Sequence, residues 1–170
     1  NKIGEKIRNG FKVSIIGEVN AGKSSLLNLL SKREVAIVSE EEGTTRDIIE
    51  VFLNIDGYPV LLSDTAGIRE AKNNIEMKGI SLALDKSKDA DLNIIMIDNS
   101  SQLINEKIKD LITKDSIVLL NKSDIKKNKK HSFDAEIILI SVKDNTNIDI
   151  LVKKMKDKLI KKFTFNNGAL

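Results

Sequence analysis

The chain of 170 residues is long enough for one compact domain and too short for two of ordinary size. Its 41% hydrophobic and 31% charged residues are typical of a folded globular protein and exclude wholesale disorder. The absence of cysteine excludes disulfides, thiolate metal sites and cysteine nucleophiles, and the single histidine argues against a histidine metal site or catalytic triad. A net charge of +3 gives no strong attraction to nucleic acid.

Apolar runs alternate with amphipathic stretches along the chain, a pattern typical of a sheet with helices on its faces. In chain order the pattern predicts a strand over Lys12–Ile16, a helix over Lys23–Lys32, strands over Ile48–Ile55 and Tyr58–Leu62, a helix over Ile75–Lys88, a strand over Leu92–Ile97, a helix over Leu103–Thr113, strands over Ser116–Leu120 and Glu136–Ile140, and a helix over Ile148–Lys162. Asp56 and Gly57 tolerate positive φ and predict a hairpin turn, so the second and third strands should be antiparallel. We expect one doubly wound α/β domain.

The alternating pattern defines this domain over residues 11–162. Residues 1–10 and 163–170 flank the pattern without belonging to it, and we interpret them either as frayed ends or as residual segments of a longer, truncated chain. No apolar run approaches the roughly 18 residues that cross a bilayer, and the first residues lack the apolar core of a secretion signal. We therefore expect a cytoplasmic location and no membrane span.

The segment Gly17–Ser24 has the sequence G-E-V-N-A-G-K-S, which matches the phosphate-loop pattern G-x-x-x-x-G-K-S/T between a predicted strand and a predicted helix. Its glycines let backbone N–H groups point at phosphate oxygens, and the helix that follows adds the positive end of its dipole. Lys23 can reach the β- and γ-phosphates, and the Ser24 hydroxyl can bind Mg²⁺. The residues expected to bind the nucleoside triphosphate here are Asn20, Ala21, Gly22, Lys23, Ser24 and Ser25.

The segment Asn121–Asp124 follows a predicted strand directly and has the N-K-x-D pattern by which P-loop GTPases read guanine. A carboxylate accepts hydrogen bonds from the guanine ring N–H and exocyclic amino group, a donor pair that adenine lacks. Asp124 is therefore predicted to recognise guanine, with Asn121 bracing the loop and Lys122 lying along the base plane. The tripeptide Ser141, Val142 and Lys143 resembles the supporting S-A-K element, although an ordinary strand-to-helix turn is the alternative.

Two further segments have the positions of nucleotide-sensing switches. Gly43, Thr44 and Thr45 open the G-T-T-R-D sequence before the second strand, and Thr45 is predicted to complete the Mg²⁺ shell when the γ-phosphate is present. Asp64 closes the third strand and can hold Mg²⁺ through water, while the N–H of Gly67 can contact the γ-phosphate. Such contacts order the switches in the triphosphate state and release them on hydrolysis.

The residue after Gly67 is Ile68, where Ras-like GTPases have a glutamine that orients the attacking water. An isoleucine has no polar group for that task. Glu76, at the start of the next predicted helix, is a candidate for it, and a solvated acid favoured by the helix dipole is the alternative. Arg46 and Arg69 are candidates for an arginine finger by location only.

Together these motifs resemble the translation-factor-related GTPases and, within them, the G domains of the MnmE (TrmE) family of tRNA-modification GTPases. The resemblance covers residues 10–162 and rests on four segments: N-A-G-K-S-S-L-L-N over Asn20–Asn28, A-I-V with G-T-T-R-D within Ala36–Asp47, D-T-A-G-I-R-E over Asp64–Glu70, and I-E-x-x-G-I over Ile75–Ile80. It implies a Ras-like P-loop GTPase fold of three layers, with a six-stranded, mostly parallel sheet, one antiparallel strand and helices on both faces. It also implies that Glu76 is the catalytic acid.

The resemblance further implies how GTP hydrolysis is assisted. G domains of this family dimerise through their switches in the presence of K⁺, which sits where an arginine finger would. In this sequence Asn20 and the backbone carbonyls of Ser39 and Glu41 have the positions that hold the ion. With Lys23, Asn20 and Glu76 as catalytic residues, the glutamate would act through a bridging water. The family modifies the tRNA wobble uridine with a flavoprotein partner, MnmG, so both MnmG and tRNA are expected partners of the full-length protein.

The sequence departs from the family pattern in two places. The phosphate loop has G-E-V-N instead of the usual G-R-P-N, and Glu40, Glu41 and Glu42 precede G-T-T-R-D, where the family is usually less acidic. The family's folate-binding domain, most of its helical domain and its C-terminal cysteine motif are absent from this sequence. Folate binding and tRNA chemistry are therefore not expected to reside in this chain alone.

Three alternatives remain open at this stage. A ribosome-assembly GTPase domain of the Era or Der type shares several of these motifs. A non-catalytic guanine-nucleotide-binding module is favoured by Ile68 and opposed by Glu76 and Asn20. An RNA-binding protein is disfavoured by the low charge and the 4% of aromatic residues.

We interpret the lysines of the last helix as its solvated face; they are Lys153, Lys154, Lys156, Lys158, Lys161 and Lys162.

Overall fold

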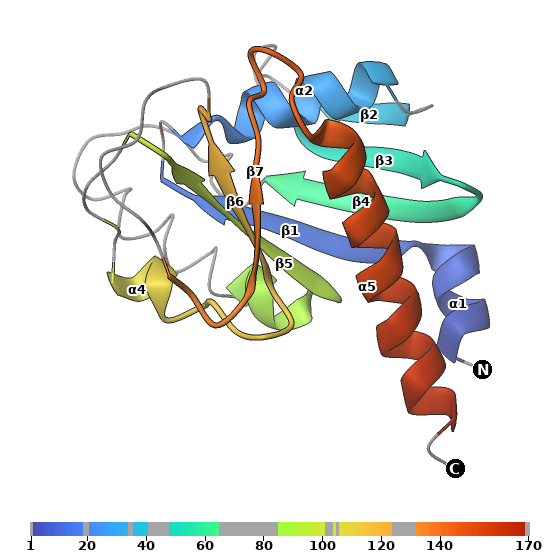
Figure 1. Ribbon diagram of the computed structural model, residues 1–170. Helices are drawn as coiled ribbons and strands as arrows, with labels where there is room; N and C mark the ends of the chain where they lie inside the picture. The colour runs from blue at the N-terminus through green and yellow to red at the C-terminus, as the bar shows by residue number, and fades with distance from the viewer. Residues whose placement is uncertain are drawn as a thin grey trace.

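One sheet of seven strands runs through the part of the chain that the structure describes, in the order β2-β3-β4-β1-β5-β6-β7 (Figure 1). The computed structural model describes residues 2–18, 21–33, 36–40, 48–64, 85–100, 104, 106–123 and 132–168. The strands are β1 (Phe11–Gly17), β2 (Ala36–Glu40), β3 (Ile48–Ile55), β4 (Tyr58–Asp64), β5 (Leu92–Asp98), β6 (Ile117–Asn121) and β7 (Glu136–Leu139).

Strand directions follow the predicted pattern. Strand β1 pairs in parallel with β4 on one side and with β5 on the other, and β6 and β7 continue the parallel set. Strand β3 is antiparallel to both β2 and β4, so among the described strands it alone runs against the others. The predicted fold class is confirmed.

The edge strand β2 is one strand more than the six that the sequence predicted. Its apolar run is only three residues, Ala36 to Val38, which is too short to stand out as a strand. The strand is instead defined by its hydrogen-bonded pairing with β3, which begins with Ala36 opposite Leu53 and has a bulge between Ser39 and Glu40.

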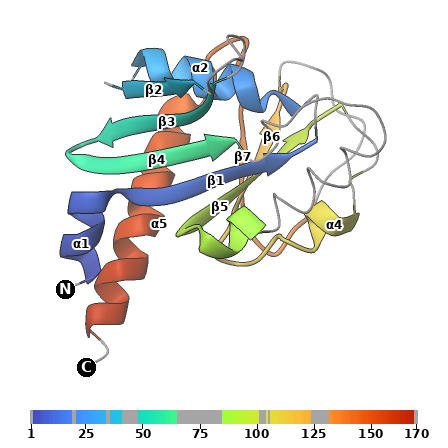
Figure 2. The same cartoon turned by 180° about the vertical axis from the view of Figure 1, so that it is seen from behind.

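The described helices are α1 (Lys2–Asn9), α2 (Lys23–Arg33), α4 (Glu106–Lys109), α5 (Ile148–Gly168) and a helical segment at 85–89. Strand residues alternate between two apolar clusters because successive side chains point to opposite faces. Val13 and Ile15 pack with buried leucines of α2 and α5, whereas Ile16 and Ile97 pack with Ile108 of α4. Helices thus cover both faces, and Figures 1 and 2 show α5 on one side of the sheet and α4 towards the other.

Two helices differ in length from their predicted spans. Of the helix predicted over Leu103–Thr113, residues 103 and 105 lie outside the described residues, and the described helix is Glu106–Lys109. After Lys109, N–H groups bond three residues back and the Thr113 N–H donates to the Ser116 hydroxyl, so the helix ends before Thr113. The last helix continues beyond Lys162 to Gly168 because Phe163 remains buried in the core. Of the helix predicted over Ile75–Lys88, residues 75–84 lie outside the described residues.

The predicted hairpin joins β3 to β4. Asp56 and Gly57 have φ values of 50° and 89°, as a two-residue turn of this kind requires, and Gly57 N donates to Asn54 Oδ1 at 2.8 Å. The turn fixes the register that places Val51 opposite Leu62, so both side chains reach the core.

Helix α1 lies beside α5 at the end of the sheet where β1 begins (Figure 2). The Phe11 and Phe163 rings meet edge to face with centroids 5.5 Å apart, and Lys6 Nζ lies 5.7 Å from the Phe163 centroid. The interpretation of residues 1–10 and 163–170 as segments outside the domain stays a prediction, although Lys2–Asn9 is helical and Phe163 is buried. None of the helices in the described ranges has the length and apolar character needed to cross a membrane.

Candidate nucleotide-binding site

The sequence motifs gather at the carboxyl ends of the parallel strands. Strand β1 ends in the phosphate loop, β4 ends at Asp64, and β6 ends at Asn121. The chain moves from β1 to one side of the sheet and then crosses over to β5 on the other side, so the sheet has a topological switch point beside β1. Open α/β sheets bind ligands in the crevice at such a point.

The phosphate loop leaves β1 through a close approach to β5. A Cβ on Gly17 would lie 2.4 Å from the Met96 carbonyl oxygen, so only glycine fits there. Gly22 has φ of 100°, which glycine adopts without strain, and α2 begins at the next residue. The positive end of the α2 dipole therefore lies at the loop. Val19 and Asn20 lie outside the described residues.

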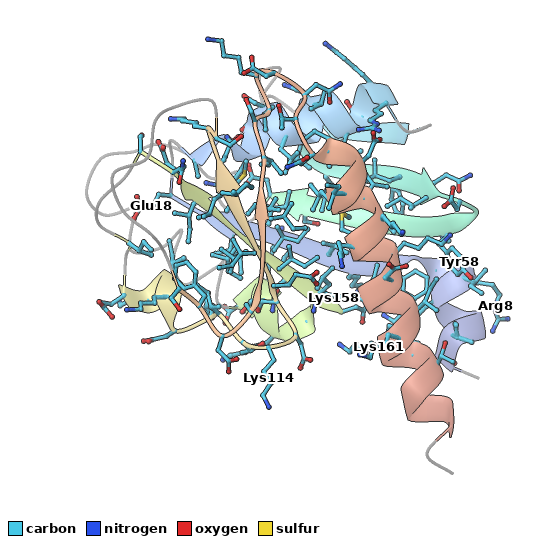
Figure 3. The ribbon with its side chains drawn as sticks, in the orientation of Figure 1. Arg8, Glu18, Tyr58, Lys114, Lys158 and Lys161 are labelled. Atoms are coloured by element: carbon cyan, nitrogen blue, oxygen red, sulfur yellow. The ribbon has the colours of Figure 1, made fainter. Side chains whose placement is uncertain are left out.

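Lys23 is buried although it is charged, with 3% of its surface exposed. Its Nζ donates to the Gly17 carbonyl at 2.7 Å and to the Glu18 carbonyl at 2.6 Å, which offsets the loss of hydration. The ammonium group is thus held against the loop that the sequence assigns to phosphate. Figure 3 shows Glu18 at this end of the molecule, away from Tyr58 and Arg8.

Asn121 joins the phosphate loop to the guanine element. Its Nδ2 donates to the Ala21 carbonyl at 2.9 Å, and its Oδ1 accepts from the Val142 N–H at 3.1 Å. Only 4% of the residue's surface is exposed, and a Cβ on Gly22 would lie 2.4 Å from its Nδ2. Asn121 therefore ties three segments together, which is the geometry of the bracing role that the sequence predicts.

The segment from Ser141 to Lys143 is built into the same junction. Ser123 N donates to the Ile140 carbonyl at 3.0 Å, and the Ser141 hydroxyl accepts from the Asp144 N–H at 3.1 Å. The bond from the Val142 N–H to Asn121 Oδ1 ties the segment to the guanine element, whereas the bond within Ser141–Asp144 is also found in ordinary turns. Its contact with a guanine base stays a prediction.

Oxygen atoms suited to Mg²⁺ lie at the ends of neighbouring elements. Asp64, with 3% of its surface exposed, ends β4 opposite Ile15 of β1, and Ser24 is in the first turn of α2. Carboxylate and hydroxyl oxygens belong to the ligand class that Mg²⁺ prefers, so these two residues fit the predicted site. The third predicted ligand, Thr45, lies outside the described residues.

Several predicted site residues lie outside the described residues, so their roles stay predictions: Asn20, Glu41, Gly43, Thr44, Thr45, Gly67, Glu76 and Asp124. Ser25 is described in α2 and Ser39 in β2, beside the bulge.

One residue of this edge, Asp98, is not part of any motif that the sequence predicted. Asp98 ends β5 in register with Asn121, and its Oδ2 accepts from Lys122 Nζ at 2.6 Å. A signal existed, because a polar residue at the end of a buried parallel strand lies at the same edge as the recognised motifs.

Known proteins resemble this chain in sequence and in fold. The family model described as 50S ribosome-binding GTPase matches residues 12–122, from β1 to the guanine element. The chain belongs to this GTPase family. It is therefore a P-loop GTPase domain that binds guanine nucleotides.

Relatives at higher identity confirm the resemblance to the G domains of tRNA-modification GTPases. The tRNA modification GTPase MnmE of Pelagibacter ubique (strain HTCC1062) is 62% identical over 124 residues, which is 73% of this chain and 28% of that protein. MnmE of Rickettsia bellii (strain OSU 85-389) is 45% identical over 163 residues, 92% of this chain and 37% of that protein. The chain thus spans well under half the length of these curated relatives.

Solved structures agree on the fold of this GTPase domain. A variant of Era from Aquifex aeolicus, crystallised with GDP and AlF4⁻, superimposes with a TM-score of 0.60 at 31% identity. The match covers 85% of this chain and 55% of that one.

Proposed function

We propose that this GTPase domain hydrolyses GTP as part of a protein that modifies the wobble uridine of tRNA. The observation that carries the nucleotide chemistry is the Asn121 junction, because one buried side chain links the phosphate loop to the guanine element. The proposed role in tRNA modification rests on the 62% identity to a tRNA modification GTPase. The flavoprotein MnmG and tRNA would act with the full-length protein.

In the proposed mechanism, water attacks the γ-phosphate in line with the leaving group. Lys23 would hold the β- and γ-phosphate oxygens, and Glu76 would position the water through an intermediary. Ser24, Thr45 and Asp64 would hold Mg²⁺. Asn20, with the carbonyls of Ser39 and Glu41, would hold K⁺. The chemistry that these ions supply when bound is neutralisation of charge on the phosphate oxygens.

Ile68 has no group to orient water, so that task falls to another residue, here Glu76. Arg46 and Arg69 are candidates for an arginine finger by location only, so K⁺ would neutralise the charge that an arginine finger neutralises in other GTPases. We propose that two G domains dimerise transiently through their switches when K⁺ is bound. Hydrolysis would then depend on the cation and on protein concentration.

GTP turnover in KCl and in NaCl at equal ionic strength, over a range of protein concentrations, tests this mechanism. We expect strong stimulation by K⁺ that rises with protein concentration. Turnover that is slow, indifferent to the cation and first order in protein would remove the roles of K⁺ and of the second copy, and would favour a nucleotide-binding module.

The role of Glu76 is tested by Glu76→Ala, with Glu106→Ala on the exposed first turn of α4 as the matched control. Glu76→Ala should keep GTP binding and nearly abolish turnover, whereas Glu106→Ala should turn over normally. Hydrolysis that survives Glu76→Ala would refute the assignment.

The role in tRNA requires the full-length protein. Mass spectrometry of tRNA nucleosides from cells whose full-length protein carries Glu76→Ala should show loss of the wobble-uridine modification. Normal modification together with abolished GTP turnover would favour the ribosome-assembly alternative of the Era or Der type.

A further inference from the structure

The carboxylate of Asp98 lies at the centre of a small polar cluster beside the guanine element. Asp98 is the last residue of β5 and pairs in register with Asn121, so it lies next to the strand end that leads into Lys122. Its side chain is only 15% exposed. Residues at this edge face the nucleotide crevice or support the residues that do.

Both oxygens of Asp98 are engaged. Oδ1 accepts from the Ser100 N–H at 2.8 Å and from the Ser100 hydroxyl at 2.6 Å, which forms an Asx turn. Oδ2 accepts from Lys122 Nζ at 2.6 Å. Ser100 therefore fixes the orientation of the carboxylate, and the carboxylate in turn fixes the end of the lysine side chain.

Burial by itself raises the pKa of the Asp98 carboxyl. Hydrogen bonds from Lys122 and Ser100, with the charge of Lys122, outweigh that effect and hold the pKa below its ordinary value. The carboxylate is consequently ionised at neutral pH, and its bond to the ammonium group is charge-assisted.

The backbone conformation of Lys122 is a second unusual feature of this cluster. Its φ is 66°, in the left-handed region that favours glycine and asparagine and costs energy for lysine. Strained backbone of this kind persists where the surrounding structure holds the residue in place, and it is common at ligand-binding sites. Here its end is held by Asp98, although 35% of the side chain is exposed.

We propose that Asp98 is a positioning residue for guanine-nucleotide binding, which holds the Lys122 side chain in the conformation that places its aliphatic stem against the base. A free lysine would lose rotamer freedom each time a nucleotide binds. Because Asp98 fixes the side chain beforehand, that cost is removed and nucleotide release is slowed. This inference rests on the proposed nucleotide site and goes beyond it in assigning a residue outside the motifs.

A double-mutant cycle on the chain of residues 1–170 tests the proposal, with dissociation of a fluorescent N-methylanthraniloyl GDP as the measurement. Asp98→Asn removes the charge and nearly keeps the shape, and Lys122→Met removes the ammonium group and keeps the stem. We expect Asp98→Asn to speed GDP release about tenfold, the effect of losing one charge-assisted hydrogen bond. In the Lys122→Met background, Asp98→Asn should change the release rate little.

The matched control is Asp56→Asn, which removes a similar ion pair, Lys156 Nζ to Asp56 Oδ2 at 2.9 Å, at the hairpin on the other end of the sheet. It should leave GDP release unchanged. In steady-state turnover, Asp98→Asn should raise the KM for GTP and leave kcat nearly unchanged, a split that a general loss of structure would not produce.

An unchanged release rate for Asp98→Asn, or additive effects of the two substitutions, would overturn the proposal. If Asp98→Asn fails to fold, Ser100→Ala provides the test, because it removes one of the two Ser100 bonds that orient the carboxylate. GDP release should then be two- to threefold faster, which is roughly half of the tenfold effect in free energy. Unchanged release in Ser100→Ala would overturn the proposal. Failure of the unsubstituted chain to bind GDP would instead refute the proposed function.

Discussion

Gly17 is the residue at which β1 becomes the phosphate loop, and its lack of a side chain decides the path of the loop. A Cβ there would meet the backbone carbonyl of Met96 at 2.4 Å, and a backbone atom in the middle of a sheet has little freedom to move aside. Gly57 offers a contrast, because it has φ of 89° and a Cβ there would have no atom within 4 Å, so a side chain at this position meets only backbone strain.

Gly17→Ala should therefore weaken GDP binding tenfold or more, the equivalent of losing one charge-assisted hydrogen bond to a phosphate. Gly57→Ala should cost roughly 1–2 kcal/mol of stability, because of its positive φ, and leave GDP binding unchanged. Isothermal titration with GDP and urea denaturation of both variants provide the check. Equal GDP affinities in the two variants would contradict the steric argument.

At the scale of secondary-structure elements, a hydrogen bond between Ser14 and Asn93 joins β1 to β5 beside the helical segment at 85–89. Ser14 and Asn93 are in register, and the buried Ser14 hydroxyl donates to Asn93 Oδ1 at 2.5 Å. Asn93 Nδ2 donates to the Ser87 carbonyl at 3.1 Å, near the end of that helical segment. One asparagine thus joins two strands and a helix end.

Asn93→Leu should destabilise the domain by about 1–3 kcal/mol, because it leaves the buried Ser14 hydroxyl without its acceptor. Adding Ser14→Ala should recover part of that loss, since a buried polar group without a partner is then removed. Urea denaturation of the two variants measures both steps. A double variant less stable than Asn93→Leu would show that the hydroxyl is satisfied in another way.

The lysines of α5 refine the interpretation of a solvated face. Lys153 and Lys161 are exposed, as that interpretation requires. The four others reach groups at or near the ends of strands: Lys154 and Lys158 pair with Glu136 at 2.8 Å and 3.9 Å, Lys156 pairs with Asp56 at 2.9 Å, and Lys162 Nζ donates to the Asp91 carbonyl at 2.9 Å. Lys158 and Lys161 lie along this face in Figure 3. Part of the face therefore helps to dock the helix on the sheet.

On the scale of the whole molecule, the nucleotide site and the contact between the Phe11 and Phe163 rings lie at opposite ends of the strands. That ring contact joins the N-terminal part of the described chain to α5. Phe163 contacts the Phe11 ring at the start of β1, whereas the phosphate loop follows the end of β1. Asp91 adds to the contacts at that end through its ion pair with Lys6 at 2.9 Å and its bond from the Lys12 N–H at 2.8 Å. The Phe11–Phe163 contact and the nucleotide site thus lie at opposite ends of β1.

Phe163→Ala should lower the free energy of unfolding by about 3–5 kcal/mol, the usual cost of removing a buried phenylalanine ring. GDP affinity at a temperature where the variant is folded should not change. Phe52→Ala is the matched control, because Phe52 is 40% exposed and should cost much less. A loss of GDP affinity in Phe163→Ala would show that the two ends of the sheet are coupled.

Short stretches of sequence were sufficient to predict the phosphate loop, the guanine element, the hairpin and the buried strands. Each of these depends on neighbouring residues: Gly17 to Ser24 form one loop, and Asp56 with Gly57 forms one turn. Local backbone preferences and periodicity fix such features before any distant part of the chain is considered.

Which distant residues meet became clear only from the folded chain. Asn121 bonds Ala21 across 100 residues, Ser14 bonds Asn93 across 79, and Lys122 bonds Asp98 across 24. The edge strand β2 and the packing of α1 on α5 belong to the same group. The physical reason is that these contacts depend on strand order and register, which arise from packing the complete sheet, and no short segment of sequence carries that information.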